Sequence, residues 1–522
     1  MTYDAVIVGY GPVGATTAAL LGKAGLRVAV IEQETGIYDK PRAITFDHEI
    51  MRVFQACGLS EHMRECTAPH PGTHYLGVDG KVIKIFDPLP PPHPLGWMPT
   101  GTFVQPQLEA ALRARVGQSE TVYVFLGHQL IDFKERNGEV EVRARELATN
   151  EARALSARYL LGCDGANSFV RKRLDIPYED LAFDEWWMVV DVLLHKPVEL
   201  PGKCIQYCWP QRPATYVIGP GNLRRWEIKV LPGEDPAAFG NRDNVVKQLA
   251  RFVDSAAIEV WRSAVYRFHA LLAERWQSGR VLLLGDAVHQ TPPFLGQGMC
   301  AGIRDAANLA WKLALVLQGQ ADERLLASYE VERKPHVRTL VSLAKQFGEI
   351  IGELDPVVAR ARDATLRGQL ERGEAETVRQ RVIPGLTGGV IDNGPAAGTL
   401  FVQPCIGDNR LLDDALHDRF LIATMSEKAQ GWLSPHALDT WRRIGGERAV
   451  ITRTRREADG ARDVLRFAET DGLFDAWMNR HGCAAVIVRP DRYVYGTAND
   501  AAELNGLVFR LAEQIKGACR WT

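Results

Sequence analysis

Residues 5–14 read Ala-Val-Ile-Val-Gly-Tyr-Gly-Pro-Val-Gly, and this stretch decides the fold of the N-terminal part. Its first four residues form a short apolar run, which is typical of a buried parallel strand. The glycine-rich turn leads into a helix that we expect to end at Gly25, and residues 27–31 then form a second strand. This strand–helix–strand order predicts a parallel sheet with right-handed crossovers.

Three glycines of this turn predict a dinucleotide site. Gly9, Gly11 and Gly14 have the spacing GxGxxG, which allows a sharp turn and a close approach of the backbone to a pyrophosphate. Glu32 stands 18 residues after Gly14 at the end of the second strand, where an acidic side chain binds a ribose hydroxyl. A lone GxGxxG is a weak motif, so an ordinary glycine-rich turn is the alternative.

Two distant segments favour FAD over NAD. Asp164 and Asp286 each follow an apolar strand, where a carboxylate can accept hydrogen bonds from a polyol such as the ribityl chain. Either aspartate could instead cap a turn or a helix. A helix that starts in the loop 296–299 would favour negative charge on a reduced flavin. The loop consists of Gly296, Gln297, Gly298 and Met299.

The composition narrows the class of protein. A chain of 522 residues predicts two or three domains, and a net charge of -2 gives no sign of nucleic acid or of an anionic membrane surface. Nine cysteines without CxxC spacing argue against a zinc site and a disulfide framework, and favour a reducing cytoplasm. Residues 5–22 are uncharged, but their glycines and Pro12 fit a strand, turn and helix better than a membrane span or signal peptide.

Further along the chain, hydrophobic periodicity predicts three regions. Residues 181–270 alternate apolar and polar side chains, which predicts an antiparallel sheet with one face in solvent. Helical spacing follows Gln297, and a second helix is expected over residues 322–352. Residues 353–398 look irregular, and a small α/β domain is expected from 399, with strands at 420–424, 449–452 and 484–488.

A series of motifs occurs along the chain: GYGPVG (9–14), Glu32, PRA (41–43), Gln105-Pro106, CDGANSFVR (163–171) and GDAVHQTPPFLGQGM (285–299). Through these motifs the chain resembles the single-component FAD-dependent aromatic hydroxylases, a family of flavoprotein monooxygenases. The shared motifs occur in the family's order over nearly 300 residues. Within the family the chain is most similar to the 3-(3-hydroxyphenyl)propionate hydroxylases, through PRAITFDHE (41–49), RDAANLAWKLALVLQG (304–319) and RPDRY (489–493).

The resemblance implies a Rossmann-like FAD-binding domain interleaved with an antiparallel substrate domain, and a redox-inert, thioredoxin-like C-terminal domain. It also implies that Arg42, Gln105, Asp164, Asp286 and the loop 296–299 hold FAD. The expected bounds are 1–75, 105–180 and 270–352 for the FAD-binding domain, 76–104 and 181–269 for the substrate domain, 353–398 for a connecting segment and 399–522 for the C-terminal domain.

The family's reaction is hydroxylation of a phenol with NAD(P)H and O2 through a flavin C4a-hydroperoxide. Ionising a phenol of pKa ~10 near pH 7 costs about 4 kcal/mol, so a proton acceptor is expected. The family uses an aspartate that we place at Asp47, which could instead be only a helix N-cap. His48 is the alternative, because its ordinary pKa is nearer the working pH.

Other side chains are candidates for substrate contacts. In the family the carbonyl of the residue at Pro293 faces the substrate hydroxyl, although a rigid turn is a compatible interpretation. Arg225 matches a family arginine near the flavin, and it could also be a solvated charge on a strand. Arg212 and Tyr216 could bind a substrate carboxylate, whereas Trp186, Trp187 and Trp209 are better explained by core packing.

Two competing functions stay open at this point. One is a tailoring monooxygenase of a larger polycyclic phenol, and the other is a non-catalytic flavin-binding protein. The family has no separate nicotinamide domain, so NADH or NADPH would bind transiently, and the sequence does not choose between them. A homodimer is expected only by analogy with relatives.

Overall fold

The computed structural model describes residues 2–407, 410–454 and 463–517, so Cys519 lies outside the described residues. The N-terminal sheet is built around β1, which pairs in parallel with β2 and with β11. The glycine-rich turn follows β1 and leads directly into α1, as the sequence predicts. The strands in spatial order are β17 (Gln277–Ser278), β18 (Val281–Leu283), β11 (Ala152–Gly162), β1 (Thr2–Val8), β2 (Val28–Glu32) and β8 (Val122–Leu126), with β10 (Glu139–Glu146) and β9 (His128–Arg136) attached to β11.

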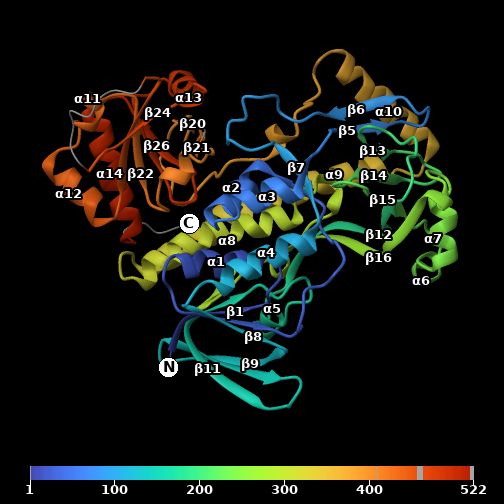
Figure 1. Cartoon of the computed structure of the whole chain (residues 1–522), viewed down its shortest axis with the longest axis horizontal. Helices are drawn as coiled ribbons and strands as arrows, with labels where there is room; N and C mark the ends of the chain where they lie inside the picture. Colours follow the sequence, from blue (N-terminus) through green and yellow to red (C-terminus); the bar gives the residue numbers. More distant parts are fainter. Residues whose placement is uncertain (1, 408–409, 455–462, 518–522) are drawn as a thin grey trace.

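Three helices lie together on one side of this sheet (Figure 1). They are α1 (Pro12–Lys23), α4 (Gln105–Gly117) and α8 (Gly298–Leu317). The helix predicted after Gln297 is α8, and it packs against α1, so the two glycine-rich segments meet. Smaller elements nearby are β3 (Thr45–Asp47), α2 (His48–Ala56), α3 (Ser60–Cys66), β4 (Thr67–Pro69), β7 (Thr100–Phe103), α5 (Phe169–Arg173) and the 3-10 turns η2 (Gly285–Ala287) and η3 (Pro293–Leu295).

The second large sheet is mostly antiparallel, as the alternation over 181–270 predicts. One of its faces packs on an apolar cluster beside α6 (Pro236–Phe239) and α7 (Arg242–Leu249). The opposite face is directed toward the FAD-binding sheet rather than toward solvent, which corrects the expectation of a wet face. The strand order is β19 (His289–Gln290), β16 (Ile258–Ala273), β12 (Tyr178–Leu194), β15 (Leu223–Lys229), β14 (Ala214–Ile218), β13 (Cys204–Tyr207), β5 (Thr73–Leu76) and β6 (Val82–Phe86).

Two short strands lie across the boundaries that the sequence suggests. β5 begins at Thr73, within the range assigned to the FAD-binding domain, yet it pairs with β13 of the second sheet. β7 falls within the range assigned to the substrate domain, yet it pairs with β3 and β4. Short strands of this kind join sheets through partners far away in sequence, which local periodicity does not reveal.

The segment 353–398 contains a regular helix, which corrects the expectation of an irregular connection. α9 (Ala327–Gly352) is followed at once by α10 (Pro356–Glu371), and a 3-10 turn, η5 (Arg379–Val382), comes later. Asp355 caps α10 by accepting the N–H groups of Val357 and Val358, and Pro356 occupies the first turn. This Asp-Pro pair is a standard helix start.

The C-terminal domain has the thioredoxin-like arrangement. β22 and β23 are parallel, β25 and β26 are antiparallel to their neighbours, and the order is β24-β23-β22-β25-β26. It is the orange-to-red domain at the left of Figure 1. Its elements are β20 (Cys405–Ile406), β21 (Arg410–Leu411), η6 (Leu412–Ala415), β22 (Leu421–Thr424), α11 (Glu427–Gln430), α12 (Pro435–Arg443), β23 (Glu447–Thr452), β24 (Leu465–Ala468), α13 (Leu473–His481), β25 (Ala485–Val488), β26 (Val494–Ala498) and α14 (Ala501–Ile515).

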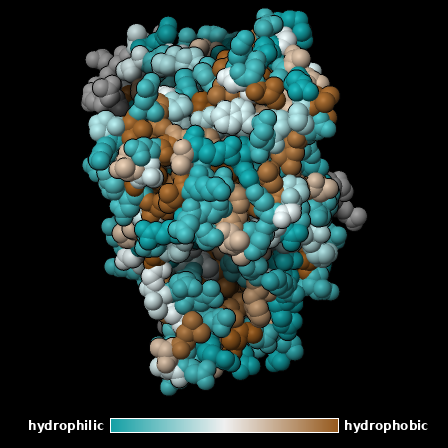
Figure 2. Space-filling model, turned by 90° about the vertical axis from the view of Figure 1, so that its right-hand side faces the viewer, coloured by the Kyte–Doolittle hydropathy of each residue, from teal (hydrophilic) through white to brown (hydrophobic). Residues whose placement is uncertain are grey.

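The surface beside the second sheet is mainly hydrophilic, with separate hydrophobic patches (Figure 2). Within the described residues, every helix is too short or too polar to cross a membrane. The cysteines of the described ranges are all free thiols.

Candidate active site

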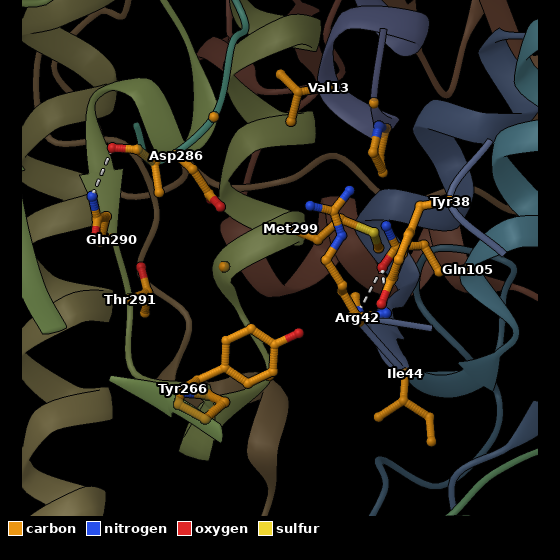
Figure 3. Close-up of a pocket in the computed structure, with 18 of the residues that line it drawn as sticks. Val13, Tyr38, Arg42, Ile44, Gln105, Tyr266, Asp286, Gln290, Thr291 and Met299 are labelled. Atoms are coloured by element: carbon orange, nitrogen blue, oxygen red, sulfur yellow. Dashed lines mark hydrogen bonds between the residues drawn. The ribbon is translucent and has the colours of Figure 1, made fainter. Parts of the chain in front are cut away.

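A cavity of about 1330 Å³ runs between the two large sheets. Ligand pockets for one drug-sized molecule usually measure about 300–1,000 Å³, so this cavity has room for more than one such ligand. Its lining extends from the glycine-rich turn after β1 to the inner face of the second sheet. Figure 3 shows Arg42, Tyr38 and Gln105 on one side of it and Asp286, Gln290 and Thr291 on the other.

The glycine-rich turn forms one end of the cavity. A Cβ on Gly14 would lie 2.0 Å from the Gly9 carbonyl oxygen, so no larger residue lets α1 start so close to β1. A Cβ on Gly11 would meet no atom within 4 Å, because Gly11 borders the cavity itself. Two glycines thus allow close packing, and the third leaves the backbone at the start of α1 open to a ligand.

Glu32 and Gln105 are fixed beside this turn. One carboxylate oxygen of Glu32 accepts the N–H of Tyr10 at 2.7 Å, and both residues 32 and 11 line the cavity. The side-chain oxygen of Gln105 accepts the N–H groups of Arg42 and Ala43, at 3.1 and 2.6 Å. Gln105 therefore holds the chain at Arg42, whose guanidinium borders the cavity (Figure 3).

The two predicted aspartates differ in how their carboxylates are used. Asp164 accepts the hydroxyl of Ser168 at 2.6 Å and the N–H of Val170 at 3.0 Å, so it caps the turn into α5 while it lines the cavity. Among the described residues, no side chain or backbone group donates a hydrogen bond to the carboxylate of Asp286. The Asp286 side chain is exposed and lines the cavity, so its carboxylate is free to accept hydrogen bonds from a polar ligand.

The loop before α8 borders the middle of the cavity. Gly296 has a φ of 58°, and a Cβ there would lie 2.4 Å from the Thr45 hydroxyl. A Cβ on Gly298, the first residue of α8, would meet no atom within 4 Å. The start of α8 thus presents free N–H groups and a positive dipole end to the cavity, beside Met299.

An ion-pair network, and not the cavity, holds Asp47. One of its oxygens accepts the N–H groups of Glu49 and Ile50 as the N-cap of α2, and the other accepts Arg304 at 2.5 Å and Gln297 at 3.1 Å. Burial alone would raise the pKa of Asp47, but Arg304 outweighs it and holds this pKa below its usual value. Asp47 lies outside the cavity lining, so its expected role as proton acceptor stays a prediction.

His48, the alternative proton acceptor, is buried next to Asp47. Burial, with smaller effects of neighbouring charges, lowers the pKa of His48 to about 4, so the ring is neutral near pH 7. Neither His48 nor Gln297 belongs to the lining of the cavity. Gln297 instead accepts a hydrogen bond from Arg304 at 2.8 Å, so Arg304 ties the start of α8 to the start of α2.

Adjacent strands of the second sheet supply the floor of the cavity. Val189, Glu227, Thr215, Gln206 and Tyr75 are cross-strand neighbours from β12 to β5, and all five line the cavity. Side chains two positions along each strand point to the same face. The next row therefore also faces the cavity, and it consists of Arg225, Val217, Cys204 and Thr73.

This alternation places the predicted substrate contacts Tyr216, Arg212 and Arg225 in different surroundings. Tyr216 points to the opposite face and packs against Trp226 in the apolar cluster. Arg212 forms an ion pair with Glu234 at 2.6 Å and is outside the cavity lining. Arg225 does line the cavity, but its guanidinium binds Asp191 at 2.7 Å and the carbonyl of Arg42, so it joins the sheet to the FAD-binding domain.

Pro293 also lines the cavity, and its carbonyl accepts the N–H of Gly296 at 2.7 Å. This hydrogen bond closes the 3-10 turn η3, so Pro293 does form a rigid turn before the glycine loop. Three cavity residues that the sequence prediction missed are Glu227, His70 and Arg379. Glu227 lies in the stretch 226–230, where apolar and polar residues alternate. Its place on the polar face of that strand was the one feature of the sequence that could have marked it as a cavity residue.

Comparisons with known proteins identify the class. The family described as FAD binding domain matches residues 2–344, and the HcaD C-terminal domain matches residues 398–514. The chain belongs to the FAD-binding aromatic hydroxylases, and it is a flavin-dependent aromatic hydroxylase.

Its similarity to individual relatives extends over nearly the whole chain. It is 34% identical to a probable NADH-specific resorcinol 4-hydroxylase of Rhodococcus jostii, over 98% of this chain and 95% of that protein. It is 33% identical to a 3-(3-hydroxy-phenyl)propionate/3-hydroxycinnamic acid hydroxylase of Burkholderia cenocepacia, over 96% and 94%. The structure of the flavin-dependent monooxygenase PieE with FAD and substrate has the same fold, with a TM-score of 0.78, 20% identity and coverage of 98% and 99%.

Proposed function

We propose that this protein hydroxylates a single-ring phenol, similar to 3-hydroxyphenylpropionate, with O2 and either NADH or NADPH. The observation that carries the proposal is one continuous cavity whose lining joins the glycine-rich turn to a buried carboxyl group, Glu227. Bound FAD supplies the redox chemistry, which is acceptance of electrons from the nicotinamide and activation of O2.

The residues at the nucleotide end fit FAD. The open backbone at Gly11 suits a pyrophosphate at the start of α1, and Glu32 suits a ribose hydroxyl. The carboxylate of Asp286 has no donor from the described residues, so it can accept a hydroxyl of the ribityl chain. The start of α8 at Gly298 then provides N–H groups for the flavin ring.

Glu227 is the proton acceptor in this proposal. Burial raises its pKa, although the Arg225 guanidinium 4.0 Å away partly offsets the effect. Ionising a phenol of pKa ~10 near pH 7 costs about 4 kcal/mol. A carboxylate with a raised pKa is a stronger base than an ordinary carboxylate, so it offsets more of this cost. The proton moves from the phenol oxygen to a Glu227 carboxylate oxygen.

Apolar side chains on the floor and walls exclude water from the ring. Trp187, Phe268 and Phe294 form a contiguous aromatic group, with Trp187 and Phe294 centroids 5.0 Å apart. Phe268 and Phe294 reach the cavity lining. This group gives an aromatic ring an apolar wall opposite the polar floor.

Both relatives described above have names that specify a single-ring phenol, which favours such a substrate over a polycyclic one. The resorcinol relative is named as NADH-specific, so NADH is the first choice to test. We also infer a cytoplasmic location from the free cysteines of the described ranges. A homodimer stays a prediction.

The test is consumption of NADH and NADPH by the purified yellow holoprotein against a panel of phenols, with products identified by mass. We expect a single-ring phenol to stimulate oxidation and to gain one oxygen atom. Stimulation only by polycyclic phenols would support the alternative substrate class. Bound FAD with no stimulation by any phenol would instead support a non-catalytic flavin-binding protein.

A further inference from the structure

We propose that Arg379 is the anion-binding residue of the substrate cavity, and that it selects phenols that carry a carboxylate on a short side chain. This inference rests on the proposed function. It concerns a residue outside both large sheets, in the segment that leads from α10 to the C-terminal domain.

Arg379 reaches the cavity from η5. Its Nη2 donates to the carbonyl of Leu295, and a Cβ on Gly296 would lie 2.7 Å from the same nitrogen. The guanidinium is therefore packed against the loop that precedes α8, and Arg379 belongs to the cavity lining. The sequence prediction missed it because nothing in residues 353–398 places them beside the second sheet.

The charges around the cavity single out Arg379. Arg225 and Arg262 both pair with Asp191, at 2.7 and 3.1 Å. Arg267 pairs with Asp184 at the edge of the sheet. Within the ranges that the structure describes, Arg379 has no carboxylate within ion-pair distance, and its one hydrogen bond leaves further N–H groups for a ligand.

Two other lining arginines lack carboxylate partners in the described ranges, but they lie at the nucleotide end. Arg113 donates to the carbonyl of Tyr10 in the glycine-rich turn, at 3.0 Å. Gln105 accepts the backbone N–H of Arg42 at 3.1 Å, and the Arg42 side chain lines the cavity there. Both suit the phosphates of FAD, which leaves Arg379 as the cation for the substrate half of the cavity.

His70 supplies a second donor beside Arg379. Its Nδ1 accepts the N–H of Gly72 at 3.1 Å, so the neutral ring carries its proton on Nε2. Burial, with the charges of Arg379 and Lys203, lowers the pKa of His70 to about 3, so the ring is neutral near pH 7. A bound carboxylate can therefore accept hydrogen bonds from the charged Arg379 guanidinium and from the neutral His70 ring, which both line the cavity.

The strands of the second sheet, which form the floor of the cavity, separate the site for the phenol oxygen from the site for the substrate carboxylate. Glu227 lies on β15, whereas the residue before Arg379, Val378, bridges Asp87 at the end of β6. Three strands, β14, β13 and β5, lie between β15 and β6, so the two side chains line separate parts of the cavity. A carboxylate on a side chain of two or three carbons extends farther from the phenol oxygen than one attached directly to the ring.

The test compares 3-(3-hydroxyphenyl)propionate with its uncharged alcohol, 3-(3-hydroxyphenyl)propan-1-ol, in the holoprotein. Dissociation constants come from changes in the flavin absorbance, and KM and kcat come from NADH consumption. We expect Arg379→Gln to weaken binding of the acid roughly 10- to 100-fold and to change binding of the alcohol less than about threefold. The matched control is Arg381→Ala, since Arg381 shares the same turn but is 64% exposed.

Equal wild-type affinity for the acid and the alcohol would overturn the proposal, as would equal losses for both in Arg379→Gln. The binding measurement separates this failure from a failure of the proposed function. If the alcohol is hydroxylated as well as the acid, the hydroxylase proposal stands and the Arg379 proposal falls. If the acid binds through Arg379 but neither compound is hydroxylated, the anion site stands and the proposed reaction falls.

Discussion

At the scale of single residues, Glu227 carries the expected pH dependence. The carboxyl must be ionised to accept a proton, so activity rises with pH through its pKa, which burial places above the ordinary glutamate value. We expect Glu227→Gln to lower kcat about 10²- to 10⁴-fold with normal FAD content. The acid limb of the kcat profile should disappear, and activity should instead rise toward the pKa of the free phenol, near ~10.

The control for this variant is Glu234→Gln, which removes a carboxylate outside the cavity that pairs with Arg212. Its kcat profile should keep the wild-type acid limb. A Glu227→Gln enzyme with an unchanged profile would remove Glu227 from the proton transfer.

Asp47 has a structural role that a pair of variants can separate. Asp47→Ala removes both the N-cap of α2 and the partner of Arg304, whereas asparagine can still cap the helix. Loss of the ion pair should cost about 3 kcal/mol, since Arg304 keeps Glu49, and loss of the cap a further ~1 kcal/mol. Thermal unfolding of the holoprotein should therefore rank wild type above Asp47→Asn and Asp47→Ala last.

The pH dependence of this stability has a definite sign. Because the folded pKa of Asp47 is lowered, its contribution is present above the ordinary carboxyl pKa of about 3.9 and is lost as pH falls through the folded value. The difference between wild type and Asp47→Ala should shrink below that pH. Normal stability with slow hydroxylation at pH 7 would restore Asp47 as the base.

The residues at the nucleotide end could be predicted from the sequence because each belongs to a local motif. Gly9, Gly14 and Glu32 belong to one strand–turn–helix–strand unit whose geometry follows from spacing alone. The proposed proton acceptor, Glu227, could not be predicted in this way. Whether Asp47 or Glu227 reaches the cavity depends on which face of its strand meets the other domain, and a shift of one residue along a strand reverses that face.

At the scale of elements, the start of α8 allows a test of FAD binding that is separate from folding. A Cβ on Gly298 meets only open space, so Gly298→Ala should keep the stability of the FAD-free protein and weaken FAD binding about tenfold or more. Gly296→Ala should instead unfold more easily by about 1 kcal/mol or more, because of its positive φ and the nearby Thr45 hydroxyl. Flavin titration and thermal unfolding of the FAD-free forms measure the two effects. Normal FAD affinity in Gly298→Ala would contradict a role for the start of α8 in binding FAD.

The elements themselves could be predicted where periodicity is long or a motif is complete. α8 and the core strands of the thioredoxin-like domain follow from helical spacing and apolar runs in the sequence. α10 was missed because its moderate amphipathicity is interrupted by arginines, although Asp355-Pro356 is a start signal. The strands β5 and β7 are too short for their sheets to be assigned from sequence.

At the scale of the whole molecule, buried charges dock the C-terminal domain on the FAD-binding domain. Glu332 of α9 accepts Arg489 at 2.7 Å and Lys312 of α8 at 2.9 Å. Tyr493 donates to Glu49 at 2.8 Å, and Glu49 in turn binds Arg304. The RPDRY motif (489–493) thus has a structural explanation, since it links the C-terminal domain to the helices that position the loop 296–299.

Removing the charge of Glu332 tests this docking. Glu332→Gln leaves the buried Lys312 without its ion-pair partner and Arg489 with Asp491 alone, which should cost about 3 kcal/mol at pH 7. We expect a lower unfolding temperature and faster proteolysis between α10 and the C-terminal domain, within residues 372–398. The control is Glu349→Gln on the same helix, which breaks only an exposed i,i+4 pair with Lys345.

Acid provides an independent measurement of the same contact. The pKa of Glu332 is lowered to about 2, because the charges of Arg489 and Lys312 outweigh burial. Its stabilisation is therefore present above the ordinary glutamate pKa of about 4.3 and declines as pH falls toward 2, so the two proteins should converge in stability there. If Glu332→Gln melts and is cleaved like Glu349→Gln at pH 7, these buried charges do not hold the C-terminal domain in place.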